Sequence, residues 1–277
     1  MAIEKINDTG AILLSITCDN PTTNWTMLNN LGARLYDDNP KVSLNVCNAM
    51  DIPVLVTLDA LHLIKLIRNC FGDYKNFIDS EGRVIQWKFV EELHAIQSQE
   101  GLHLANKIRK AHINFSDSKM TGYLATQLFS ESLAKSLKFC REELKLEQFR
   151  ESEGTEFFVK MMNDLFDILN SKSKFGKGLK SPLNLSSMIA FISKVNLAIE
   201  YVSNLKHSNG KLIVNGPRKC AFRGILISLK SFEYMTKLYV QTNHVSYLLT
   251  YKFRDIKILV ILTDRVRDLN LIEKSDL

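Results

Sequence analysis

Two short runs of apolar and β-branched residues near the start of the chain predict β-strands. The first spans residues 11–17 and leads to Asp19, and the second spans residues 54–58 and leads to Asp59. Between them, apolar side chains at helical spacing predict a helix over residues 23–31. A strand, a helix and a second strand, with an acid at the carboxyl end of each strand, indicate an α/β unit.

Beyond the second strand the apolar pattern becomes helical. Residues 79–83 predict a turn, and after Trp87 apolar side chains recur every three to five positions. Between Met120 and Leu144 this spacing predicts one buried stripe, and Thr155 is the expected cap of a further helix. Helices are also expected at about 187–206 and 220–240. The expected fold class is therefore mixed, with a partial α/β unit followed by a large helical part.

The cysteines and the apolar runs narrow the class of protein. The five cysteines lie far apart and form no Cys-x-x-Cys motif, which argues against a disulfide framework and against a zinc finger. The apolar run at 258–262 is far shorter than the ~20 residues of a membrane helix, and the N-terminus has no export signal. The sequence thus predicts a soluble intracellular protein without a membrane partner.

Charge is distributed unevenly along the chain, whose formal net charge is +6. Residues 1–100 carry 8 Lys/Arg and 13 Asp/Glu, whereas residues 171–240 carry 12 and 2. The second block is a candidate polyanion-binding surface, and a solvated basic helix face is an equally good interpretation. Within this block, residues 172–178 predict a basic, glycine-containing loop. Its Gly176-Lys177-Gly178 segment is interpreted first as a basic turn, and only second as a phosphate-binding loop. The candidate DNA contacts are Lys177, Lys180, Arg218 and Lys219.

Several stretches, in the same order along residues 11–253, resemble the core of P-element-type DNA transposases, a family that includes the THAP-domain-containing transposases of animals. The stretches are Ser15-Ile-Thr-Cys-Asp19, Leu58-Asp59-x-x-His62, Gly101-Leu-His-Leu-Ala-Asn-Lys107, His112-Ile-Asn-Phe115, Lys119-Met120, Asn163-Asp-Leu-Phe-Asp-Ile-Leu-Asn-Ser171, Phe175-Gly-Lys-Gly178, Ser228-Leu-Lys-Ser231 and Tyr247-Leu-Leu-Thr-Tyr-Lys-Phe253.

This resemblance implies a ribonuclease H-like catalytic fold that is split by a long helical insertion which binds GTP. Residues 1–86 then correspond to part of the catalytic domain, and residues 87–245 to the insertion. Residues 246–277 correspond to a remnant of the closing ribonuclease H-like helix with a divergent tail.

The family cuts and joins DNA with two Mg²⁺ ions held by two Asp and one Glu. The two ions activate the attacking oxygen and stabilise the leaving one, and several carboxylates are needed to hold both ions in place. By its match, Asp19 is the second catalytic acid and a metal ligand, and Asp59 and His62 belong to a supporting motif. From the residues alone, Asp59 also fits an N-cap, and His62 fits a hydrogen-bonded structural histidine.

Two departures from the family pattern predict that the chain alone does not transpose DNA. The first catalytic Asp of the family lies upstream of the matched residues, as does its zinc-coordinating DNA-binding domain. The position of the catalytic Glu is occupied by Leu259. One acid of three cannot hold two divalent ions.

The nucleotide prediction rests on the insertion. Gly-x-x-x-x-Gly-Lys-Ser/Thr is absent, so a P-loop is excluded. Phe166-Asp167 matches the aromatic–acid pair that recognises the guanine base in the family, and Lys107 and Lys119 lie in stretches that match its phosphate-binding lysines. Phe166 also has the helical spacing of a core residue.

Three functions are compatible with these observations. The first is a nuclear component of DNA transposition that binds GTP and transposon DNA. The second is a non-catalytic regulatory module that docks on a full-length transposase or on itself. The third is a decayed gene fragment, whose partial sheet would expose an edge prone to aggregation.

Overall fold

The computed structural model describes residues 5–6, 8, 12–19, 22–47, 51–101, 104, 106–253 and 257–261. These residues form two compact units, each assembled from separate segments. The first unit contains the described parts of Met1–Ala60, Asp167–Leu197 and Arg223–Leu277, and the second contains those of Leu61–Phe166 and Ala198–Phe222. The chain therefore leaves the first unit and returns to it twice.

A four-stranded sheet with the order β2-β3-β1-β7 forms the first unit's frame. Its strands are β1 (Ile12–Cys18), β2 (Ser43–Cys47), β3 (Pro53–Leu58) and β7 (Lys257–Ile261). The central strands β1 and β3 run parallel, with Cys18 opposite Leu58. Both predicted strands are confirmed, whereas β2, which pairs antiparallel with β3, was not predicted.

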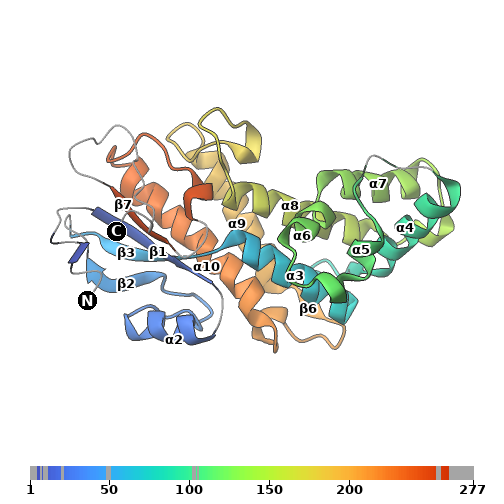
Figure 1. Cartoon of the computed structure of the whole chain (residues 1–277), viewed down its shortest axis with the longest axis horizontal. Helices are drawn as coiled ribbons and strands as arrows, with labels where there is room; N and C mark the ends of the chain where they lie inside the picture. The colour runs from blue at the N-terminus through green and yellow to red at the C-terminus, as the bar shows by residue number, and fades with distance from the viewer. Residues whose placement is uncertain are drawn as a thin grey trace. The chain divides into compact units, whose positions relative to one another are not determined.

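Two helices pack in the first unit beside this sheet. Helix α2 (Thr22–Asn30) confirms the helix predicted over 23–31, and its Trp25 and Leu28 are fully buried. Helix α10 (Lys219–Met235) runs alongside the sheet (Figure 1), where Ser228 Oγ accepts a hydrogen bond from the backbone N–H of Leu58 at 3.1 Å. Hydroxyls on α10 thus satisfy backbone groups of β3.

Residues 257–261 correct the expectation of a helical remnant. They form β7, which pairs antiparallel with β1 and places Leu259 opposite Ser15. The aliphatic, β-branched sequence of this segment favours a strand, and an unpaired edge of β1 offers it backbone hydrogen bonds. That edge of β1 is therefore covered.

The second unit contains a small antiparallel sheet with the order β5-β4-β6 that sequence reasoning did not foresee. Its strands are β4 (Asn76–Ile78), β5 (Val84–Gln86) and β6 (Lys206–His207). The predicted turn at 79–83 is confirmed as the link between β4 and β5. There Asp79 accepts hydrogen bonds from the backbone and the guanidinium of Arg83, and Gly82 has a φ of 80°.

Helices make up most of the remaining structure. Those within the second unit, apart from the first residue of α3, are α3 (Ala60–Tyr74), α4 (Lys88–Glu100), α5 (Lys110–Ile113), α6 (Gly122–Leu128) and α7 (Glu131–Glu142). Helices α8 (Glu153–Leu169) and α9 (Met188–Asn204), like α10, continue from one unit into the other. Short helical turns are η1 (Phe115–Ser118), η2 (Glu147–Phe149), η3 (Gly178–Lys180), η4 (Ile213–Asn215), η6 (Thr250–Phe253) and the π-helical η5 (Thr236–Val240). Over the described residues, none of the helices is both long enough and apolar enough to span a membrane.

Aromatic side chains form the core of the second unit. Phe158 of α8 lies 5.2 Å from Phe71, 5.8 Å from Phe77 and 5.7 Å from Phe129, measured between ring centroids. All four rings are almost completely buried. This cluster joins three helical segments and the small sheet.

Two helix predictions in this unit need correction. The stripe from Met120 to Leu144 is divided between α6 and α7, and its ends are exposed, 79% for Met120 and 43% for Leu144. Thr155 does not cap α8, because α8 begins two residues earlier. Instead Thr155 is buried, and its hydroxyl accepts a hydrogen bond from the backbone N–H of Gln86 at 2.8 Å.

Candidate functional site

The carboxyl ends of β1 and β3 place two acids at one edge of the sheet, as the sequence predicted. Asp19 and Asp59 follow the paired residues Cys18 and Leu58, and the backbone N–H of Asp59 donates to the carbonyl of Cys18 at 3.3 Å. Asp59 is only 9% exposed, whereas Asp19 is half-buried. Burial, reinforced by the neighbouring Asp19, raises the pKa of the Cys18 thiol to about 12. Cys18 is therefore a protonated, structural residue at neutral pH.

These acids do not make a two-metal centre by themselves. Among the described residues, no three or more His, Cys, Asp or Glu side chains gather where a metal ion could bind. A pair of Mg²⁺ ions needs more carboxylates than Asp19 and Asp59 supply, and Leu259 lies on β7 with no carboxylate to add. Thus the residues present do not fit the Mg²⁺ pair that the resemblance implied.

His62 lies in the first turn of α3. Its Nδ1 is 3.5 Å from Nζ of Lys65, which is buried and also lies 3.9 Å from the sulfur of Met120. A lysine ammonium can only donate in such a contact. The contact matches the interpretation of His62 as a structural histidine better than that of a metal ligand.

The two residues of the predicted base-binding pair lie next to each other near the C-terminal end of α8. Phe166 and Asp167 are both half-buried. The carboxylate of Asp167 has a side-chain exposure of 21% and lies 3.5 Å from Nζ of Lys180. One residue predicted for GTP and one predicted for DNA are therefore joined in a single ion pair.

Thr250 anchors the backbone that follows Asp167. Its buried hydroxyl donates to the carbonyl of Ile168 at 2.6 Å and accepts from the N–H of Ser171 at 2.9 Å. Ser171 Oγ donates in turn to the carbonyl of Lys180 at 2.8 Å. These bonds tie η6, the end of α8 and the following loop together, and they fix the backbone on both sides of the Asp167–Lys180 pair.

The basic loop after α8 is tightly closed rather than open. A Cβ added to Gly176 would lie 2.0 Å from the carbonyl oxygen of Lys180, so only glycine fits this close approach. Lys172 lies over the ring of Tyr251 at 5.3 Å, while Lys177 is exposed. The sequence identified this loop correctly and missed the contacts that close it.

The other predicted cations lie in the second unit, where they have different surroundings. Asp73 forms ion pairs with Arg218 and with Lys119, the latter at 3.9 Å. Lys107 is exposed and Lys219 is half-buried. The four predicted DNA contacts are thus split, with Lys177 and Lys180 in the first unit and Arg218 and Lys219 in the second.

Sequence reasoning missed Asp73, Thr250 and Arg68 as supporting residues. Arg68 is fully buried and donates to the carbonyl of Ser118 at 3.0 Å, so it holds the turn that precedes Lys119. Thr250 does lie within a stretch that resembles the family, Tyr247–Phe253. Nothing in the local sequence distinguishes the role of Arg68 or Thr250, because their partners are about 50 and 80 residues away.

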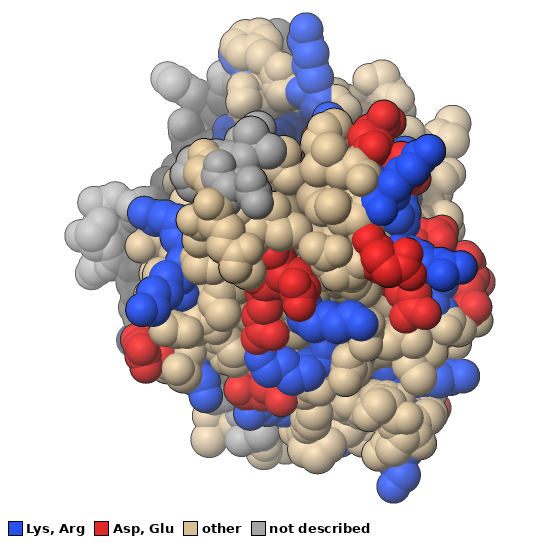
Figure 2. All heavy atoms as spheres, turned by 90° about the vertical axis from the view of Figure 1, so that its right-hand side faces the viewer, with Lys and Arg blue, Asp and Glu red and all other residues tan. Residues whose placement is uncertain are grey.

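Charges of both signs alternate on the face of the molecule where α4 and α7 lie (Figure 2). Ion pairs such as Lys135–Glu131 at 2.8 Å and Arg141–Glu156 at 2.6 Å account for this mixture. A mixed surface does not attract a polyanion strongly. This face is therefore a poor candidate for the DNA surface.

His112 closes the N-terminal turn of α5. It is fully buried, its Nδ1 accepts from the N–H of Arg109 at 3.1 Å, and its Nε2 lies 3.1 Å from Oε1 of Gln127. These two bonds require the neutral ring with the proton on Nε2. Burial is the main cause that holds the pKa of His112 below its usual value.

Stability is accordingly expected to fall as the pH drops below about 6.5, because the unfolded histidine then binds a proton that the folded one does not. His112 contributes at most ~1.4 kcal/mol per pH unit to the slope of the unfolding free energy against pH. His112→Gln should flatten the pH dependence of the free energy of urea unfolding between pH 7 and pH 5. His94→Gln, a half-buried histidine on α4, is the matched control. Equal slopes for wild type and His112→Gln would contradict the assignment.

Comparison with known proteins places these features in a family context. Residues 61–182 match the family described as "TNP-like, GTP-binding insertion domain". The chain is 31% identical over 256 residues to "DNA transposase THAP9" of Homo sapiens, which covers 91% of this chain and 28% of that protein. It is 26% identical over 253 residues to "Transposable element P transposase" of Drosophila melanogaster, covering 90% of this chain and 31% of that protein. The chain thus spans about three tenths of the length of these relatives.

A solved structure agrees with the sequence matches. The fold superimposes on the "Drosophila P element transposase strand transfer complex" with a TM-score of 0.75 and 26% identity, over 91% of this chain and 54% of that one. The resemblance predicted from the sequence is confirmed, as is the mixed fold class with a helical insertion.

Proposed function

We propose that this homologue of P-element-type DNA transposases binds GTP at the C-terminal end of α8, binds DNA in the nucleus, and does not cut DNA by itself. The observation that carries the proposal is the Asp167 carboxylate, partly desolvated and paired with Lys180, which follows Phe166 on a helix within the matched GTP-binding insertion family.

Guanine recognition by this pair has a direct physical basis. Guanine presents two adjacent N–H donors, which match the two oxygens of a carboxylate, and an aromatic ring provides a stacking surface. Lys180 orients the Asp167 carboxylate before the base arrives. The resemblance also proposes Lys107 and Lys119 as partners of the phosphates, and both lie in the second unit.

The DNA-binding part of the proposal rests on the structural neighbour, which is a DNA strand transfer complex, and on the basic residues Lys177, Lys180, Arg218 and Lys219. Cations of this kind contact phosphates without reading sequence. Inactivity in cleavage is supported by Leu259 at the position where the family has Glu. Asp19 and Asp59 would hold Mg²⁺ only if further acids were supplied to this edge.

Titration calorimetry with GTP and Mg²⁺ tests the nucleotide site. Asp167→Asn is expected to weaken GTP binding by about 10–100-fold, because it removes charge-assisted hydrogen bonds worth roughly 1.5–3 kcal/mol. Asp164→Asn on the same helix removes one equally exposed carboxylate and should leave the affinity unchanged. Wild-type protein that produces no heat with GTP, or an Asp167→Asn protein with wild-type affinity, would refute the site.

A further inference from the structure

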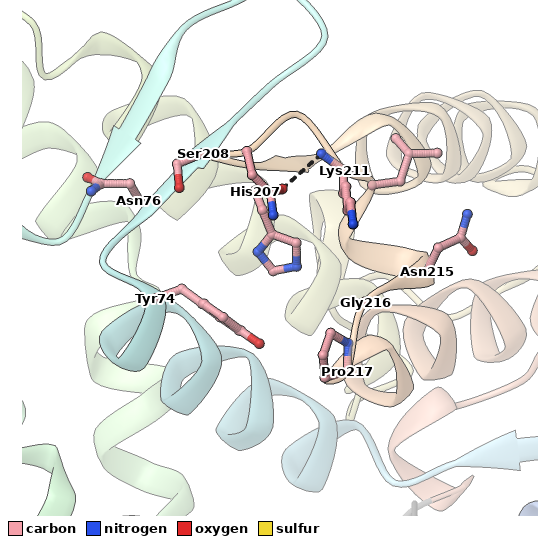
Figure 3. Close-up of a pocket in the computed structure, with 10 residues that line it drawn as sticks. Tyr74, Asn76, His207, Ser208, Lys211, Asn215, Gly216 and Pro217 are labelled. Carbon is pink, nitrogen blue, oxygen red and sulfur yellow. Dashed lines mark hydrogen bonds between the residues drawn. The ribbon is translucent and has the colours of Figure 1, made fainter.

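A pocket in the second unit lies between the end of α3 and the segment that leads into α10 (Figure 3). Strand pairing creates it, since Phe77 of β4 is opposite His207 of β6. Its volume is about 640 Å³, within the roughly 300–1,000 Å³ of small-ligand sites. Side chains that line it include those of Tyr74, Asn76, His207, Lys211, Leu212 and Pro217.

The imidazole of His207 points into this pocket, toward the space between Tyr74 and Pro217 (Figure 3). His207 is only 8% exposed, and its ring nitrogens have no hydrogen-bond partner in the described part of the chain. Because the ring faces the pocket, a molecule that enters the pocket can reach these nitrogens. Burial lowers the pKa of His207, and the neutral ring offers one donor and one acceptor.

Gly216 keeps His207 accessible. A Cβ at this position would lie 2.8 Å from Nε2 of His207, closer than the two atoms can approach. The backbone of Gly216 has a φ of −80°, which any residue adopts, so its conformation does not require glycine. A side chain at position 216 would fill the open space in front of Nε2 of His207.

Aromatic and basic groups border the same space. The rings of Tyr74 and His207 are 4.6 Å apart, and Tyr74 is 37% exposed. The guanidinium carbon of Arg218 lies 5.7 Å from the Tyr74 ring, and Lys211 is exposed at the rim. Aromatic faces stack on bases, and flanking cations follow the phosphates, which is how proteins bind unpaired nucleotides.

We propose that this pocket receives the base of one unpaired nucleotide in bound DNA, with its flanking phosphates on Lys211 and Arg218. His207 supplies hydrogen bonds to the edge of the base, and Tyr74, Leu212 and Pro217 supply flat and apolar surface. A base within a duplex is stacked and paired, so it enters such a pocket only when unpaired. This proposal rests on the DNA binding proposed above and adds to it a preference for DNA that contains an unpaired base.

Fluorescence anisotropy with the full chain and two labelled DNA duplexes tests this preference. The duplexes are identical except that one carries a single unpaired deoxyadenosine. The wild type is expected to bind the bulged duplex about tenfold more tightly, since stacking of one base is worth ~1–3 kcal/mol. Gly216→Ala should abolish the difference while leaving affinity for the paired duplex unchanged. Tyr74→Ala should also abolish the difference, and because the Tyr74 ring contacts Arg218 its affinity for the paired duplex is measured alongside. Tyr74→Phe should keep it, and Tyr234→Ala, which removes another exposed tyrosine, is the matched control.

Each outcome decides the proposal. Equal affinity of the wild type for both duplexes overturns the pocket assignment and leaves DNA binding intact. A preference that survives in folded Gly216→Ala and Tyr74→Ala proteins also overturns it, because the unpaired base then binds elsewhere. Failure to bind either duplex refutes the proposed DNA binding together with this inference. If free adenosine monophosphate binds the wild type but not Gly216→Ala, and no bulge preference exists, the pocket serves a free nucleotide, and the proposal that it receives an unpaired base of bound DNA is wrong.

Discussion

Replacing Phe158 by alanine is expected to lower the free energy of unfolding by about 3–5 kcal/mol. Phe158 is completely buried in α8 and contacts the rings of Phe71, Phe77 and Phe129. Truncation removes apolar burial and leaves a cavity that neighbours from several elements cannot fill without moving. The loss should be concentrated in the second unit.

Urea denaturation gives the total change, and hydrogen exchange resolved by mass spectrometry assigns it to α3 and to the start of α8. Phe175→Ala is the matched control, because this phenylalanine is 80% exposed and its removal should change stability by less than about 0.5 kcal/mol. A Phe158→Ala protein as stable as Phe175→Ala would mean that the aromatic cluster is not the core of this unit.

Thr250→Val is expected to destabilise the first unit by about 2–4 kcal/mol. Valine has nearly the shape of threonine, but it leaves the N–H of Ser171 and the carbonyl of Ile168 buried without this partner. Each unsatisfied group costs roughly 1–3 kcal/mol. The same change loosens the backbone that follows Asp167, so GTP affinity should fall together with stability.

Thr250→Ser is the control, because it keeps the hydroxyl and removes only a methyl group. Its loss should be near 1 kcal/mol, the value for one buried methyl or methylene group. Calorimetric titration with GTP accompanies urea unfolding for both variants. If valine and serine destabilise the protein equally, the hydroxyl does not hold this junction, and the proposed support of Asp167 is wrong.

The local features of the fold were predictable because they depend on neighbouring residues. The helix at Thr22–Asn30, the strand at Pro53–Leu58 and the turn around Gly82 each follow from apolar spacing or from turn chemistry within a few positions. The strand at Lys257–Ile261 was not predicted. A resemblance suggested a helix there, whereas its own aliphatic composition and the free edge of β1 favour a strand.

In the candidate sites, too, single residues could be predicted from the sequence, whereas their contacts could not. The resemblance proposed Asp19, Asp59, Phe166 and Asp167 as site residues, and the two strands that end at Asp19 and Asp59 were predicted from their apolar runs. The parallel register of these strands comes from the structure. No local signal linked Asp167 to Lys180, Lys119 and Arg218 to Asp73, or Thr250 to Ile168 and Ser171. These pairs join residues that are distant along the chain, and spacing carries no information about them.

The sequence by itself determined the resemblance to P-element-type transposases, the alternation of strand and helix at the start, and the absence of a P-loop. Only the tertiary structure decided that Lys180 faces Asp167, that Thr250 secures the end of α8, and that His207 is buried with its ring open to a pocket. Periodicity and motifs record which residues are adjacent along one element. Ion pairs, buried hydroxyls and pockets depend on which elements meet, and that follows from the packing of the whole chain.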